Sequence, residues 1–226
     1  AGEDKPFLML DAHLDTIGMV VTSIDDDGFC KVGSCGRLDA RVLTGAEITV
    51  WGETPMHGVI CSMPPHLSRG EHSKAAQVGE LSIDVGFRAD EARKRITPGD
   101  RVTMAQSFKT MRGGLVCGKS LDNRAGVAAL MIAGELLRQE NTPACNVIFS
   151  MSEQEETGGA PAAAAAFRLR PQEAIVVDVS FAKGYHTPSE VEACLGGGPM
   201  LGIAPILSHP MLQRLREAAG HAGIAV

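Results

Sequence analysis

Three apolar runs, each followed by polar residues, constrain the fold of this chain more than any other feature of its sequence. They cover residues 7–10, 146–151 and 174–179, and most positions within them are apolar. Such strands belong in a sheet that is covered on both faces, because a sheet with one solvated face alternates apolar and polar residues. Helical patterns lie between the runs, at residues 123–139 and 160–167. Strands that alternate with helices predict an α/β fold.

The segment from residue 21 to 110 has a different pattern, in which short strand signals alternate with turn residues. This is the composition of a small β-barrel or sandwich. We expect a helical turn at residues 90–95 and strands at residues 20–24, 29–32, 47–51, 58–62, 81–85 and 101–105. The pattern therefore predicts two domains. Residues 1–20 and 111–226 form the α/β domain, and residues 21–110 form a β-rich insertion.

Composition limits the class of protein. With 226 residues, of which 44% are hydrophobic, the chain can bury one sizeable core and a smaller one. A net charge of −6, without clustered basic and aromatic residues, argues against a nucleic-acid partner. No apolar run reaches the roughly 18–20 residues that a membrane span requires. The six cysteines show no metal-binding or paired spacing, which favours free thiols in a cytoplasmic protein over a disulfide framework.

The charged residues that follow the apolar runs are the main indication of function. Glu155 and Glu156 are adjacent in the loop after the second run, His13 follows the first, and Asp178 directly follows residues 175–177 of the third. Adjacent carboxylates repel, and a bound cation is the usual compensation. The carboxyl ends of strands are also where open α/β sheets place their binding sites. A further candidate, Asp122, precedes the long helix.

Each of these residues has an ordinary structural alternative. Asp122 is well placed to be a helix N-cap, Asp178 is a typical turn residue, and a lone His13 is more often structural than a ligand. The functional interpretation rests on the coincidences taken together. Imidazole and carboxylate groups at the ends of several elements in one domain form a ligand set suited to a two-metal hydrolase.

Sequence spacing suggests two further roles. In a His-X-Asp sequence, the carboxylate of Asp15 can accept a hydrogen bond from the second ring nitrogen of His13, which fixes the tautomer that binds metal. The side chains of consecutive residues point in different directions. One of Glu155 and Glu156 can therefore bind metal while the other takes a proton from a bridging water.

Three sequence motifs resemble those of a known family: DAHLDTIG at residues 11–18, GKSLDNRAG at 118–126 and QEETG at 154–158. They are similar to motifs of the dinuclear metal aminopeptidases that build tetrahedral dodecamers, a family that includes glutamyl and deblocking aminopeptidases. PPHL, IDVG and TPGD in the insertion also resemble that family's β domain. The likeness implies a three-layer, zinc-exopeptidase-like α/β domain with a small β-barrel domain inserted.

The resemblance implies a specific activity, the hydrolysis of N-terminal residues from peptides with two divalent metal ions, zinc or cobalt. By this likeness, His13, Asp122 and Asp178 bind one ion. Asp122 bridges to a second ion held by Glu156, and Glu155 is the general base. Asp15 supports catalysis from beside the histidine.

Two structural expectations accompany this resemblance. Related zinc exopeptidases have a cis peptide bond after the bridging aspartate, which would lie here between Asp122 and Asn123. The β-rich insertion is expected to make the subunit contacts of a homo-oligomer, in which dimers build a hollow dodecamer that admits peptides.

The sequence departs from the family in one serious respect. The second metal of that family takes a histidine from near the C-terminus, and neither His209 nor His221 matches that motif. The chain also begins almost at a strand and ends where another would begin, which suggests a piece truncated at both ends. The other histidines considered as ligands are interpreted as loop residues: His66, His72 and His186.

Two other classes of function stay open. A glycoside hydrolase needs two carboxylates about 5–9.5 Å apart across the sugar, which adjacent Glu155 and Glu156 supply poorly. The other alternative is a catalytically incompetent assembly subunit or fragment, because the second metal would lack its histidine.

Overall fold

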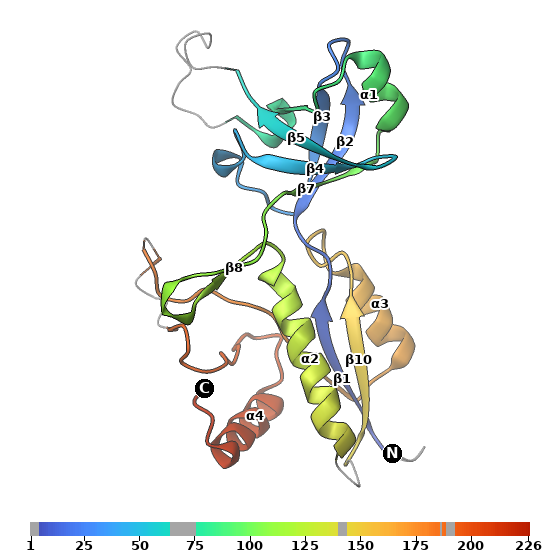
Figure 1. The fold of residues 1–226 in the computed structure, drawn as a ribbon. Coiled ribbons are helices and arrows are strands. Elements are labelled where there is room, and N and C mark those ends of the chain that lie inside the picture. Colours follow the sequence, from blue (N-terminus) through green and yellow to red (C-terminus); the bar gives the residue numbers. More distant parts are fainter. Residues whose placement is uncertain (1–4, 64–75, 140–143, 186, 189–192) are drawn as a thin grey trace. The chain divides into compact units, whose positions relative to one another are not determined.

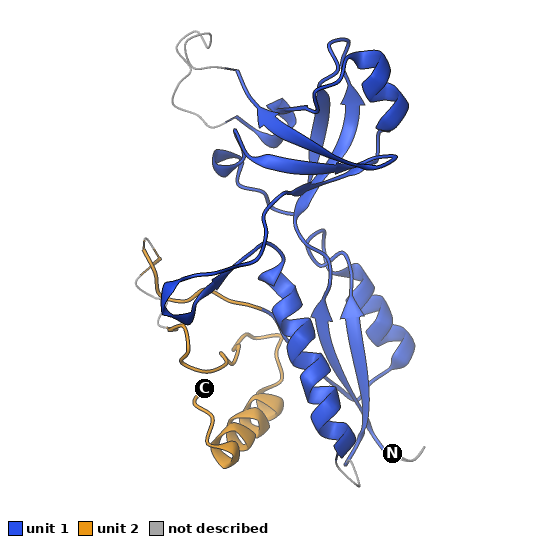
Figure 2. Cartoon of the chain, in the orientation of Figure 1, with its two compact units in different colours: residues 1–178 blue, residues 179–226 orange. Residues whose placement is uncertain are grey.

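The computed structural model of the protein describes residues 5–63, 76–139, 144–185, 187–188 and 193–226. The chain divides into two compact units, residues 1–178 and residues 179–226 (Figure 2). The first unit contains a parallel sheet with its helices and a closed barrel. In the described part of the second unit, the regular element is helix α4 (His209–Ala222), which begins after the N-cap Ser208.

A short parallel sheet forms the centre of the α/β part of the first unit. Its order is β10 (Asn146–Ser152), β1 (Phe7–His13) and β11 (Glu173–Val176), and both outer strands run parallel to β1. The three strands confirm the predicted apolar runs and the α/β fold. The largest differences from the predicted boundaries are that β1 continues through His13 and that β11 already ends at Val176.

Two helices accompany this sheet, α2 (Leu121–Gln139) and α3 (Ala160–Leu169) (Figure 1). Helix α2 packs along β1, and its Val127 and Leu130 share a buried cluster with Ala12. At Gly134, an added Cβ would lie 3.2 Å from the ring of Phe149. The small residues of α2 therefore allow the close approach to the sheet that the sequence predicts.

The β-rich segment forms a closed barrel of six strands, with the order β2-β3-β6-β5-β4-β7 and β7 returning to β2. Its interior is lined by apolar side chains from alternate strand positions, as on β5, where exposed and buried residues alternate. The strands are β2 (Gly18–Ile24), β3 (Cys30–Cys35), β4 (Glu47–Trp51), β5 (Pro55–Cys61), β6 (Ser82–Asp84) and β7 (Arg101–Met104). All six overlap the predicted strands, and the barrel form of the prediction is confirmed.

Short elements complete the barrel and its connection to α2. Helix α1 (Ala89–Arg95) lies between β6 and β7, and a hairpin of β8 (Lys109–Thr110) and β9 (Val116–Cys117) follows the barrel. Three 3-10 turns occur among the described residues: Ala40–Val42, Val78–Glu80 and Arg112–Gly114. The barrel strands span residues 18–104, so β2 crosses the boundary predicted at residue 20. The division into two domains stays a prediction.

No disulfide joins any of the six cysteines, all of which lie among the described residues. Cys30 is fully buried in the barrel core. Burial, followed by the charges of Asp25 and Asp100, raises the pKa of its thiol to about 11. Cys30 is thus a packing residue, since the thiolate is the reactive form of cysteine. Among the described helices, none combines the length and the apolar character needed to cross a membrane.

Candidate active site

The parallel register of the sheet brings the first site residues to one edge. His13, the last residue of β1, lies opposite Ser152, the last residue of β10. On the other side of β1, Val176 pairs with Asp11, and the next N–H, of Val177, donates to the Asp11 carbonyl at 2.8 Å. Asp178 lies two residues after Val176, just as His13 lies two residues after Asp11, so Asp178 reaches the level of His13. This edge is formed by the carboxyl ends of all three strands, as is usual for sites on such sheets.

Helix α2 brings Asp122 to the same edge. Because β10 runs parallel to β1, the helix that precedes it must travel from the carboxyl edge back to the amino edge, so its first turn lies at the site. Asp122 Oδ1 lies 3.1 Å from His13 Nε2, and Asp178 Oδ1 lies 3.7 Å from the same nitrogen. The peptide bond between Asp122 and Asn123 is cis, which confirms that expectation.

The structure thus brings together the three residues expected to bind one metal ion. The potential ligand atoms of His13, Asp122 and Asp178 all lie within 4.8 Å of one another. The imidazole is 3% exposed, whereas the two carboxylate side chains are 59% and 43% exposed. A buried histidine therefore forms the floor of a cluster whose carboxylates are open to solvent.

Asp15 connects this cluster to the loop that carries the two glutamates. Its carboxylate accepts the backbone N–H of Glu155 at 3.1 Å and that of Glu156 at 3.2 Å. The loop is thereby held against the turn that follows β1. As a result, Glu155 Oε2 lies 3.9 Å from His13 Nε2. The same nitrogen faces Asp122 and Asp178.

We predicted a hydrogen bond from His13 to the Asp15 carboxylate, but the acceptor in the structure is the backbone carbonyl of Asp15. His13 Nδ1 is hydrogen-bonded to the backbone carbonyl of Asp15 at 3.1 Å, and the nearest carboxylate oxygen lies at 3.4 Å. The Asp15 carboxylate instead accepts the backbone N–H groups of Glu155 and Glu156. The carbonyl can only accept, so Nδ1 donates, and a neutral imidazole presents the lone pair of Nε2 to the aspartates.

The electrostatics of the cluster reflect an excess of negative charge. Burial is the largest influence on the pKa of His13 and lowers it, but the charge of Asp178, the hydrogen bond to Asp15 and the charges of Asp15 and Glu155 together raise that pKa above its ordinary value. Burial first, and then the charge of Asp122, raises the pKa of Glu156. Proximity to so many carboxylates disfavours additional negative charge.

These observations fit a bound divalent cation. In the tautomer with Nδ1–H, the lone pair of Nε2 and the facing carboxylate oxygens repel one another, and either a proton on Nε2 or a cation between them relieves the repulsion. One imidazole nitrogen with carboxylate oxygens is a donor set suited to zinc and to related first-row metals. After burial, the charge of Asp122 is the next influence that raises the pKa of Glu156, so these two carboxylates interact electrostatically.

Unusual backbone conformations also concentrate at this edge. Three non-glycine residues among those described have left-handed φ angles: Ser120, Gln154 and Arg170. Ser120 lies two positions before Asp122, and Gln154 directly precedes Glu155. Such conformations are unfavourable for residues with a Cβ and cluster at functional sites. Sequence patterns contain no signal for them.

Sequence reasoning also missed a contact between the barrel and the site. Gly36 follows β3 and has a φ of +79°, and an added Cβ there would lie 3.2 Å from Glu156 Cβ and 2.7 Å from Ile17 Cγ2. Glycine is required because both the backbone angle and the space exclude a side chain. Gly36 and Glu156 are far apart in the sequence, and a lone glycine in a turn does not indicate which residue it contacts.

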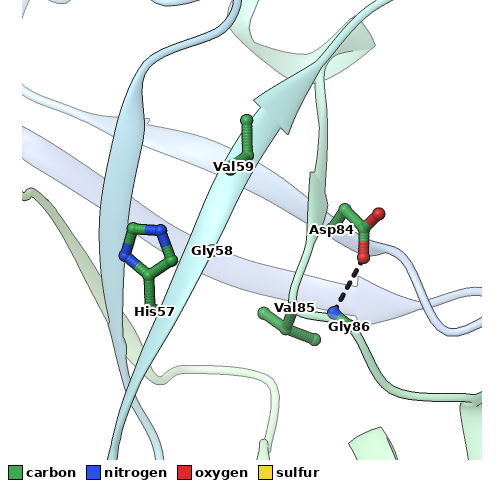
Figure 3. A pocket seen from close by; sticks show the side chains of 6 residues that line it. All are labelled: His57, Gly58, Val59, Asp84, Val85 and Gly86. Carbon is green, nitrogen blue, oxygen red and sulfur yellow. Dashed lines mark hydrogen bonds between the residues drawn. The ribbon is translucent and has the colours of Figure 1, made fainter.

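The other candidate positions lie elsewhere. His209 and His221 belong to α4 in the second unit. Two pockets on the barrel contain none of the candidate site residues. In the pocket of Figure 3, the Asp84 carboxylate accepts the Gly86 N–H at 2.8 Å and so stabilises a turn. Three of the histidines considered from the sequence lie outside the described residues: His66, His72 and His186.

The sequence and the fold are those of an aminopeptidase family. The chain belongs to the M42 glutamyl aminopeptidase family, whose model matches residues 1–226. It is 28% identical over 219 residues to the lysyl aminopeptidase of Pyrococcus furiosus, a match that covers 95% of this chain and 62% of the relative. The chain thus spans about three fifths of that relative's length.

Solved structures agree with this assignment. The TET aminopeptidase of the marine sediment archaeon Thaumarchaeota archaeon SCGC AB-539-E09 matches with a TM-score of 0.90 and 28% identity, over 100% of this chain and 66% of that one. The Pyrococcus horikoshii TET1 peptidase, which can assemble into a tetrahedron or a large octahedral shell, matches with a TM-score of 0.81 and 29% identity, over 99% and 68%. These matches confirm the resemblance expected from the motifs.

One similar structure has a different name. A Thermotoga maritima protein described as an endoglucanase matches with a TM-score of 0.75 and 27% identity, over 99% of this chain and 67% of that one. The name corresponds to the glycoside hydrolase alternative.

Proposed function

We propose that the whole protein is a metal-dependent aminopeptidase that removes N-terminal residues from peptides. The observation that carries the proposal is the convergence of Asp122, Asp178 and Glu155 on one nitrogen of the buried His13. Membership of the M42 glutamyl aminopeptidase family and the likeness to named aminopeptidases support the choice of peptides as substrates.

Two divalent ions, zinc or cobalt, fit the residues at this edge. His13, Asp122 and Asp178 would hold the first ion, and Asp122 with Glu156 would contribute to the second. Bound there, the ions would supply Lewis-acid polarisation of the scissile carbonyl and make water a better nucleophile near neutral pH.

The chain's own residues provide the proton transfer and the positioning. Glu155 acts as the general base, taking a proton from the attacking water and returning it to the leaving amine. Its side chain is half exposed, so substrate and water can reach it. Asp15 holds the backbone of Glu155 and Glu156 in place, and its carbonyl orients His13.

Glycoside hydrolysis is the second candidate, since one similar structure is named an endoglucanase. Two adjacent glutamates on one loop are poorly suited to act from both sides of a sugar, which requires carboxyl groups about 5–9.5 Å apart. An incompetent assembly subunit is a third possibility, and it predicts that no substrate is turned over.

Activity assays on the protein in its full length separate these functions. We expect hydrolysis of a panel of aminoacyl p-nitroanilides that is abolished by a chelator such as 1,10-phenanthroline and restored by zinc or cobalt. Polysaccharide substrates, tested in parallel, should not be cleaved. Chelator-resistant cleavage of a β-glucan would instead establish a glycosidase, and absence of both activities in metal-loaded protein would contradict an enzymatic role.

We also propose that the whole protein is a homo-oligomer in which dimers build a dodecamer. The assembly of the similar Pyrococcus horikoshii peptidase supports this. The barrel is the proposed contact region, because large apolar side chains are exposed on it: Val42, Trp51, Val59, Met63 and Phe87.

A further inference from the structure

Among the described residues of the α/β part, Asn123 is the most deeply buried polar one, with a relative exposure of 0%. Its side-chain amide uses both ends. The Nδ2 group donates to the Val177 carbonyl at 2.7 Å, and Oδ1 accepts the Gly126 N–H at 3.1 Å. One planar group thus connects the first turn of α2 to the segment that follows β11.

The position of this link relative to the site suggests its purpose. Asn123 directly follows Asp122, and Val177 directly precedes Asp178. The amide therefore joins the two carboxylate-bearing segments at the residues adjacent to the carboxylates.

We infer that Asn123 is a positioning residue, which sets the separation of Asp122 and Asp178 and thereby the affinity of the cluster for a divalent cation. The inference rests on the metal site of the proposed function and adds a residue that contacts neither metal nor substrate. Metal-ligand distances tolerate only about 0.2 Å of error, so a link that fixes two ligand-bearing segments has a direct effect on affinity. Loss of such an outer partner typically lowers metal affinity about 10–100-fold.

Gly126 provides a second, independent observation. An added Cβ at this position would lie 2.3 Å from Asn123 Oδ1, closer than any real contact of a Cβ atom. Glycine is unfavourable inside a helix, so its presence in α2, three residues after Asn123, requires a reason. The reason is that only glycine leaves space for the asparagine amide.

The chemistry of the link also explains why asparagine is needed. The side chain at position 123 must donate to the Val177 carbonyl and accept from the Gly126 N–H, and an amide group can do both. Aspartate has the same shape but would present an oxygen to the Val177 carbonyl, and two acceptors cannot form a hydrogen bond. The buried charge would add a further penalty.

Cobalt titration of the intact 226-residue chain tests the inference, with the visible absorbance of bound Co²⁺ and chelator competition as readouts. Asn123→Asp and Gly126→Ala should each weaken Co²⁺ binding about 10–100-fold. Gly134→Ala is the matched control, because it adds the same methyl group to the same helix against Phe149 instead of the link. It should change affinity less than about twofold.

Three further results decide between explanations. The double variant Asn123→Asp with Gly126→Ala should bind about as weakly as the weaker single variant, because both changes break the same link. If either folded variant, verified by circular dichroism, binds Co²⁺ as tightly as the unaltered chain, the inference is wrong even if its melting temperature falls. If the unaltered chain itself does not bind Co²⁺, the metal site of the proposed function fails and this inference fails with it.

Discussion

Replacing Glu155 by glutamine should lower the turnover of peptide hydrolysis about 100-fold or more in the full-length protein, without loss of bound metal. Glutamine has nearly the same size, and the backbone N–H of residue 155 would still donate to Asp15. The amide cannot accept a proton, however, so the attacking water would lose its base. Steady-state kcat, together with metal content from elemental analysis, measures both parts of the prediction.

Glu156→Gln is the matched control for this experiment, since it makes the same chemical change one residue later. Its main effect should be weaker metal binding, because Glu156 is assigned as a ligand and not as the base. Metal supplied in excess should therefore restore part of the activity of Glu156→Gln and none of that of Glu155→Gln. Near-normal turnover of Glu155→Gln would show that Glu155 is not the general base. Loss of its metal would show that Glu155 is a ligand.

Removing the barrel should reduce the full-length protein from a large assembly to a monomer or dimer and leave the first metal site able to bind. Strands β2 and β7 are hydrogen-bonded neighbours, with Met19 opposite Val102, so the chain enters and leaves the barrel at adjacent points. A short glycine-serine linker can therefore replace residues 18–104. The site residues His13, Asp122 and Asp178 all lie outside this segment.

Light scattering after size-exclusion chromatography measures the mass, and zinc titration measures the remaining site. Activity is not a suitable readout here, because the deletion also removes Gly36 from beside Glu156. A full-length protein that elutes as a monomer would contradict the assembly proposal. A deletion variant that still forms the large assembly would show that the contacts lie outside the barrel.

The fold could be predicted because its elements depend on local patterns. Continuous apolar runs identified the three parallel strands, and turn residues at short intervals identified the barrel strands, including Glu47–Trp51 to the residue. Register was not predictable in this way. The pairing of Val176 with Asp11, which brings Asp178 level with His13, depends on contacts between segments that no local pattern specifies.

The clustering of the candidate ligands could be predicted from the sequence, but the contacts that support them could not. His13, Asp122 and Asp178 each lie at or within two residues of the end of an element, and charged residues at such points are visible in a sequence. The acceptor for His13 Nδ1 and the buried amide of Asn123 depend on where strands end and on backbone groups. Every residue has a carbonyl and nearly all have an N–H, so the sequence does not distinguish those that take part.

The central claim is that His13, Asp122 and Asp178 hold a divalent cation. Diffraction from zinc-soaked crystals, recorded on both sides of the zinc absorption edge, tests it most directly because the anomalous signal locates zinc alone. The account predicts a peak at the carboxyl edge of the sheet, about 2.0–2.2 Å from His13 Nε2 and from a carboxylate oxygen of each aspartate. Crystals that contain zinc at other positions and show no peak at this edge would contradict it.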